Sequence, residues 1–111
     1  MTGLADGSGV VVALATCPDE ATALALARTL VDERLAACVN VAGRVRSIYR
    51  WKGAVEEADE RLLVIKARAD RMESLAARLA ELHPYDVPEL LAFPVELGLG
   101  PYLEWVHAEG G

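Results

Sequence analysis

The two histidines and two cysteines are the side chains of this sequence best suited to binding a metal ion. They form no Cys-x-x-Cys, His-x-His or His-Glu-x-x-His spacing, so any metal site must be assembled in space. His83 lies between a predicted helix and Pro84, and an imidazole held there can bind a metal ion or move a proton. Alternatively, its ring nitrogens bond the backbone at the helix C-terminus.

The cysteines occupy different settings. Cys17 precedes Pro18 at the predicted start of a helix, where the helix dipole lowers the pKa of a thiol and favours the thiolate that copper prefers. Otherwise Cys17 is an ordinary residue at a strand end. Cys38 lies in the string Leu35-Ala36-Ala37-Cys38-Val39, where a thiol is more often a small buried hydrophobic group than a ligand. We expect no disulfide between them, because intracellular thiols stay reduced.

A local cationic strip offers a second kind of site. Arg46 and Arg50 share one face of a predicted strand with Arg44, and Lys66 lies on the probable neighbouring strand with Arg68. Such a strip can hold a small anion. Alternatively, it pairs within or between subunits with nearby acidic residues, namely Glu56, Glu57, Asp59 and Glu60.

Tyr85 and Glu89 follow His83 in a proline-bounded connector, and together these three residues could form an acid–base cluster in a pocket. Alternatively, Tyr85 packs and Glu89 bonds backbone amides. The sequence contains no Gly-rich phosphate loop, nucleophile elbow or pair of catalytic carboxylates. We therefore expect a protein that is not an enzyme.

The hydrophobic pattern predicts the elements that position these residues. Residues 1–9 are expected to be a flexible leader, Gly43 to bend the second strand, and Asp70 with Glu73 to form a capping box. The order is that of an α+β, ferredoxin-like βαββαβ sandwich with a short C-terminal helix, in one domain over residues 1–111. The predicted strands cover 10–15, 37–51, 61–66 and 90–95, and the predicted helices cover 18–34, 70–82 and 102–107.

The composition of the chain limits the kinds of partner that it can bind. Apolar residues make up 53% of the chain, which is enough for a core, and the net charge of −6 repels nucleic acid and anionic membranes. With no signal peptide and no apolar run that could span a bilayer, the expected compartment is the cytoplasm.

Two predicted strands are apolar on both faces, which indicates self-assembly. Residues 10–15 and 62–65 do not alternate apolar with polar, although helices cover only one face of such a sheet. A second copy of the chain is the simplest cover for the other face. The alternative is that the C-terminal segment folds over it.

A set of motifs in order resembles the CutA family of divalent-cation tolerance proteins, from about Val10 to Val106. The motifs are Pro18-Asp19-Glu20-Ala21, Leu35-Ala36-Ala37-Cys38-Val39-Asn40, Ser47-Ile48-Tyr49-Arg50-Trp51-Lys52-Gly53, Ile65-Lys66 and His83-Pro84-Tyr85-Asp86-Val87-Pro88-Glu89, with Tyr102 and Trp105. The resemblance implies a ferredoxin-like fold, a homotrimer similar to the PII signalling proteins, a cytoplasmic setting and a link to copper and other divalent metals.

The resemblance also implies where a metal would bind. Family members that bind copper use a cysteine in strand one and adjacent histidines before the Pro-Tyr, and the matching positions here are Ala15, Leu82 and His83. Of these three positions, only His83 has the side chain that copper-binding members use. Cys17 and Cys38 are further candidate metal ligands. The leading hypothesis is a trimeric protein of copper or other divalent-metal tolerance, and the alternative is a PII-like trimer that binds a small anion in subunit clefts.

Overall fold

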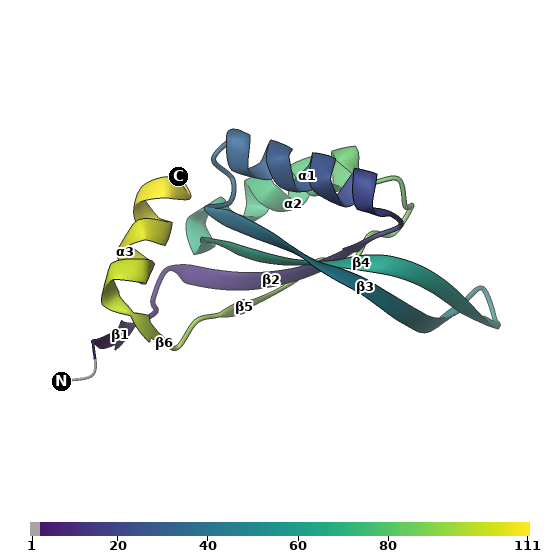
Figure 1. Ribbon diagram of the computed structural model, residues 1–111, viewed down its shortest axis with the longest axis horizontal. Helices are drawn as coiled ribbons and strands as arrows, with labels where there is room; N and C mark the ends of the chain where they lie inside the picture. Colours follow the sequence, from purple (N-terminus) through teal and green to yellow (C-terminus); the bar gives the residue numbers. More distant parts are fainter. Residues whose placement is uncertain (1–2) are drawn as a thin grey trace.

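The computed structural model describes residues 3–111, and Figure 1 shows how their elements are arranged. None of the helices in this range is long and apolar enough to cross a membrane. In chain order the elements are β1 (Leu4–Asp6), β2 (Val10–Cys17), α1 (Glu20–Asp32), β3 (Cys38–Trp51), β4 (Ala54–Arg68), the short 3-10 helix η1 (Ala69–Arg71), α2 (Met72–Leu82), β5 (Leu91–Pro94), β6 (Leu97–Leu99) and α3 (Gly100–Glu109).

The main sheet has four antiparallel strands in the order β3-β4-β2-β5. Helices α1 and α2 both lie on one face of it (Figure 1). The order β2, α1, β3, β4, α2, β5 confirms the predicted ferredoxin-like α+β fold. The predicted C-terminal helix is present as α3.

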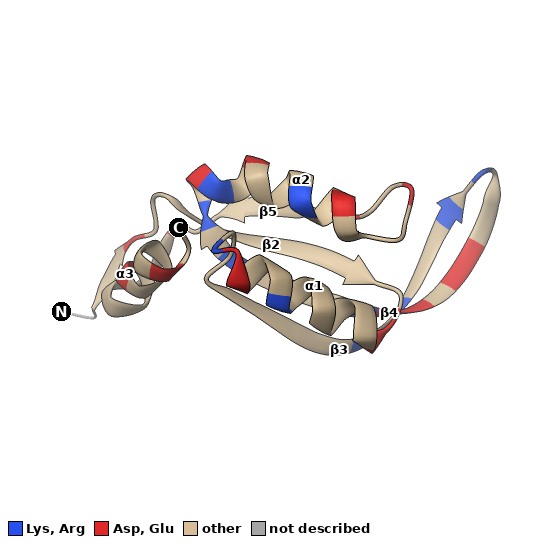
Figure 2. Ribbon diagram, turned by 90° about the horizontal axis from the view of Figure 1, so that it is seen from above, with Lys and Arg blue, Asp and Glu red and all other residues tan. Residues whose placement is uncertain are grey.

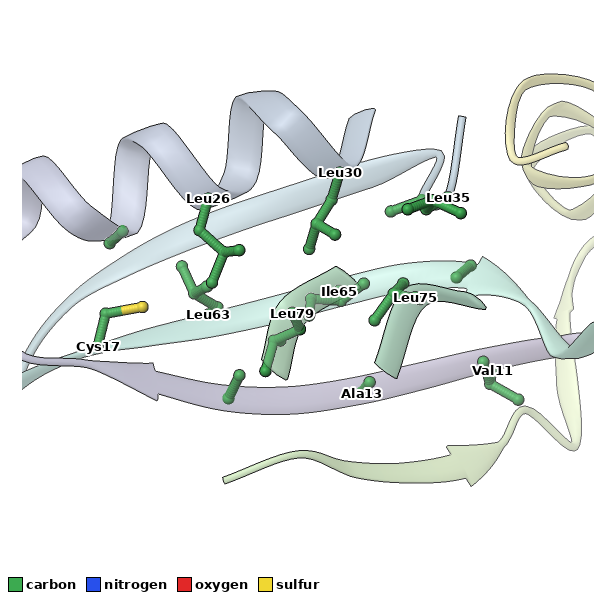
Figure 3. Close-up of a cluster of buried hydrophobic side chains, with 14 residues drawn as sticks. Val11, Ala13, Cys17, Leu26, Leu30, Leu35, Leu63, Ile65, Leu75 and Leu79 are labelled. Carbon is green, nitrogen blue, oxygen red and sulfur yellow. The ribbon is translucent and has the colours of Figure 1, made fainter. Parts of the chain in front are cut away.

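The hydrophobic core lies between the sheet and the two helices (Figure 3). Alternate residues of β2 and β4 point toward the helices, because side chains alternate between the faces of a strand. Leu26 and Leu30 of α1 are spaced by four, as are Leu75 and Leu79 of α2, so each pair lies on one helix face. Burying such a leucine contributes about 1.5–3 kcal/mol.

The helix starts differ from the sequence prediction. α1 begins at Glu20 rather than at residue 18, because Asp19 is its N-cap and accepts a 2.8 Å hydrogen bond from the Thr22 amide. The capping box predicted for α2 is wrong. The carboxylate of Asp70 instead binds the guanidinium of Arg68, and η1 leads into α2 without a side-chain cap.

The expected flexible leader is wrong for residues 3–9. Strand β1 pairs with β6, so that Leu4 lies opposite Leu99. Beyond it the Gly7 amide donates a 2.9 Å hydrogen bond to Glu96, and a Cβ on Gly7 would lie 2.2 Å from the carbonyl oxygen of Val95. The close approach requires glycine. Met1 and Thr2 lie outside the described residues.

The second and third strands of the ferredoxin-like unit form a long hairpin that projects beyond the helices (Figure 1). The predicted bend is confirmed by a register shift between Val41 and Arg44, with Gly43 at φ +105°. β4 runs from 54 to 68 rather than from 61 to 66, so the acidic stretch belongs to the strand. Figure 2 shows these acidic residues on one strand of the hairpin beside basic residues on the other.

The sheet face opposite α1 and α2 is apolar, as predicted. α3 covers only one end of it, where Val10 packs with Leu103 and Val106. Further along, Leu91 and Phe93 are 58% and 45% exposed. We call the uncovered part the open face, and its apolar residues are Val12, Leu14, Leu62, Val64, Leu91 and Phe93.

Candidate functional site

His83 is buried and its two ring nitrogens both bond the backbone. Pro84 forces His83 into an extended conformation directly after α2. The Tyr85 amide donates to Nδ1 at 3.1 Å, so Nδ1 carries no proton, and Nε2 donates to the Thr16 carbonyl at 2.7 Å. The imidazole thus ties the end of α2 to β2. A metal ion would have to displace one of these two bonds.

Cys17 does not have the activated thiol that its position before Pro18 predicts. It is the last residue of β2, is fully buried and faces the helices on the same side as Ala15. Burial, and then the negative charges of Asp19 and Glu60, raise the pKa of the Cys17 thiol to about 11. The prediction of a lowered pKa is wrong because the thiol is buried, and because Pro18 and Asp19 separate Cys17 from Glu20, where α1 begins.

Cys38 lies apart from Cys17. It opens β3 opposite Lys66, whereas Cys17 lies opposite Arg61, a separation of about 17 Å along β4. Cys38 is half-buried on the side of the open face, and both thiols are free. One chain therefore does not bring the two cysteines together.

The predicted cationic strip is divided between the two faces of the sheet. Arg46 lies opposite Asp59 and Lys66 opposite Cys38, which places them about 24 Å apart along β4. Arg46 forms ion pairs with Asp59 at 2.9 Å and Glu57 at 2.8 Å. Lys66 forms a hydrogen bond with the side chain of Asn40. Both residues lie on the face of the sheet opposite that of Arg46. Arg50 is exposed near the hairpin tip, so no single small anion contacts all three.

Tyr85 and Glu89 do lie together, at a cavity of about 440 Å³ beside the hairpin, whose lining extends from Glu60 to Trp51 near the tip. The Tyr85 hydroxyl donates a 3.0 Å hydrogen bond to Glu60, whose side chain is buried. Burial and this carboxylate raise the pKa of Tyr85 to about 12, so the phenol stays protonated. The cavity is lined by Thr16, Tyr49, Trp51, Glu60, Pro84, Tyr85, Asp86, Val87 and Glu89.

Tyr49, Trp51 and Glu60 also line this cavity, and we did not predict them as site residues from the sequence. The available signal was the alternation of β3, which places Tyr49 and Trp51 on the same side as Val45, directly opposite Glu60. The sequence does not show the register of the hairpin, which is needed to place Glu60 beside these two residues. Within residues 3–111, no three side chains among His, Cys, Asp and Glu gather closely enough to hold a metal ion.

A protein-family model described as "CutA1 divalent ion tolerance protein" matches residues 11–109. The chain belongs to this family. "Protein CutA" from Mus musculus is 46% identical over 93% of this chain, and "Divalent-cation tolerance protein CutA" from Thermus thermophilus is 45% identical over 90%. The chain spans 61% of the mouse protein and 59% of "Protein CutA" from Homo sapiens, but 97% of the Thermus protein.

Solved structures of CutA1 family members show the same fold. CutA from Xylella fastidiosa has a TM-score of 0.91 and 42% identity, with 94% of this chain and 100% of that chain covered. CutA1 from Oryza sativa has a TM-score of 0.91 and 35% identity, with 95% and 96% covered. The family predicted from the ordered motifs is thus confirmed.

Proposed function

We propose that this CutA1 family protein is a homotrimer that binds divalent metal ions, copper included, and acts in metal tolerance without catalytic turnover. The observation that carries the proposal is the family match over residues 11–109, together with relatives whose names state divalent-cation tolerance. The two free thiols are consistent with the cytoplasm as its compartment.

The open face supports self-assembly. Phe93 and Leu91 expose a large part of their side chains there beside half-buried Val12 and Val64. Apolar patches of this kind on soluble proteins mark interaction surfaces. A closed, symmetric assembly of identical chains covers the face in every copy.

The metal ligands are proposed to come from more than one chain, because residues 3–111 of a single chain gather no set of three. Cys38 is the best placed of the predicted ligands, since it is only half-buried and lies on the side of the open face. His83 and Cys17 are buried, and His83 already bonds the backbone through both nitrogens. Binding of metal at His83 would require local rearrangement.

Calorimetric titration of the reduced, oxygen-free protein with Zn²⁺ tests the metal site without redox chemistry, and Cu(I) supplied from a competing chelator tests copper. Saturable binding that weakens at least tenfold in Cys38→Ser is the expected result. Cys17→Ser is the matched control, because that thiol is buried away from the open face. Absence of saturable binding to the wild-type protein would contradict the proposal, and equal binding by Cys38→Ser would reject the ligand assignment.

The alternative function, a PII-like trimer that binds a small anion, has less support. Arg46 is already paired with two carboxylates, and Lys66 lies on the other face of the sheet. Phosphate-dependent stabilisation that disappears in an Arg50→Ala variant would favour this alternative.

A further inference from the structure

The cavity beside Tyr85 combines aromatic rings with carboxylates. The rings of Tyr49, Trp51 and Tyr85 line it, and each of these side chains remains at least one third exposed. The faces of aromatic rings carry partial negative charge and attract cations within about 6 Å of the ring centre. Trp51 shows this attraction within the chain, because the Lys52 ammonium lies 5.9 Å from its ring centroid.

Charge points to the same class of ligand. Glu60, Asp86 and Glu89 line the cavity, and its lining residues include no lysine, arginine or histidine. The hydrogen bond from the Tyr85 hydroxyl to Glu60 fixes the ring against the carboxylate, so the aromatic wall and the buried negative charge keep one arrangement. The lining thus offers a cation opposite charge and aromatic rings, with Tyr85 directly beside the Glu60 carboxylate, and it repels an anion.

We propose that this cavity binds a small organic cation with an alkylated ammonium head group. Its volume of about 440 Å³ is within the range of small-molecule sites. Aromatic cages with nearby carboxylates suit cations whose alkyl groups make them weakly hydrated. A bare metal ion fits less well, because Glu60, Asp86 and Glu89 do not come together as a set of three ligands.

The proposal does not rest on the proposed metal-binding function, although Tyr85 of the cavity contacts His83. Thr16 and Glu60 lie at the end of the open face, in line with Leu14 and Leu62 of the same strands. A neighbouring chain in an assembly could therefore border the cavity. If a cationic side chain of that neighbour already fills it, added ligand will not bind, and the proposal of a small-molecule site fails.

Titration of the assembled 111-residue chain with tetramethylammonium chloride, followed by amide chemical shifts, tests the proposal. Sodium chloride at the same concentrations controls for ionic strength, and tert-butanol controls for a neutral ligand of similar size. The expected result is a saturable shift at Thr16, Tyr85 and Glu89 with tetramethylammonium alone. Equal shifts with tert-butanol, or shifts that follow sodium chloride, would overturn the proposal.

Variants then locate the site. Trp51→Leu is expected to weaken tetramethylammonium binding about three- to thirtyfold, the range that one lost cation–π contact implies. Trp105→Leu is the matched control, since Trp105 is equally exposed on α3, away from the cavity. Glu89→Gln should weaken binding, and Glu104→Gln should not. Unchanged affinity in both Trp51→Leu and Glu89→Gln, with circular dichroism showing that they fold, would reject this cavity as the site.

Discussion

Replacement of His83 by alanine distinguishes a histidine that holds the fold from one that mainly binds metal. In the folded chain the imidazole joins the end of α2 to the Thr16 carbonyl, two residues beyond the last β2 residue that pairs with β5. The His83→Ala variant loses that link and leaves the carbonyl without its partner. We therefore expect a large loss of stability in the protein without any metal.

The magnitude follows from the two hydrogen bonds. The buried 2.7 Å bond from His83 contributes about 1 kcal/mol, and an unpaired buried carbonyl costs about 1–3 kcal/mol more. The bond from the Tyr85 amide adds little, because water can replace its partner at that partly buried position. The free energy of unfolding should fall by about 2–4 kcal/mol.

Urea unfolding at fixed protein concentration, with a chelator present, measures this change. His107→Ala is the matched control, since that histidine is exposed on α3, and its unfolding free energy should stay within about 0.5 kcal/mol of the wild type. A His83→Ala protein as stable as the wild type but unable to bind metal would refute the structural role and favour His83 as a ligand.

Three further predictions concern the core, the hairpin and the change of the unfolding free energy at alkaline pH. Leu30→Ala should lower the unfolding free energy by about 2–5 kcal/mol in urea, whereas Leu24→Ala on the exposed side of α1 should cost less than about 1 kcal/mol. Arg46→Ala should change it by less than about 1 kcal/mol at any salt concentration, because its ion pairs are exposed; a larger effect would contradict this. The pKa of Cys17 is raised from 9.0 to about 11, so the unfolded chain loses that proton first and stability should fall as the pH rises through this interval. Cys17→Ala should flatten that part of a stability curve measured against pH, and an unchanged slope would show that the thiol is not responsible.

The elements that carry the core were predictable, because their apolar spacing matches the buried faces. The spacing of Leu75 and Leu79 predicted α2. The run of β2 that is apolar on both sides predicted both the strand and the apolar open face. The three-residue strands β1 and β6 were missed, since so short a pair has no pattern of its own. The acidic part of β4 was missed because Asp and Glu are rare in strands, and Arg46 opposite Asp59 offsets that tendency here.

The site was less predictable than the fold, because its parts meet only through tertiary contacts. Tyr85 and Glu89 stand four residues apart in the sequence, but Glu60 reaches Tyr85 from the hairpin. Cys17 was misjudged because the strand continues to that residue, which leaves the thiol buried rather than at the start of a helix. The capping box of α2 was predicted wrongly for a similar reason. Asp70 binds Arg68, and the spacing of Asp70 and Glu73 alone does not decide which partner Asp70 takes.

We propose that the chain covers its open face by assembling with copies of itself. Light scattering on the protein as it elutes from a sizing column, over a wide range of concentrations, gives the mass of the particle directly. We predict a mass three times that of the 11.9 kDa chain, and dissociation when Phe93 is replaced by aspartate. A folded wild-type particle with the mass of one chain at every concentration would contradict the account.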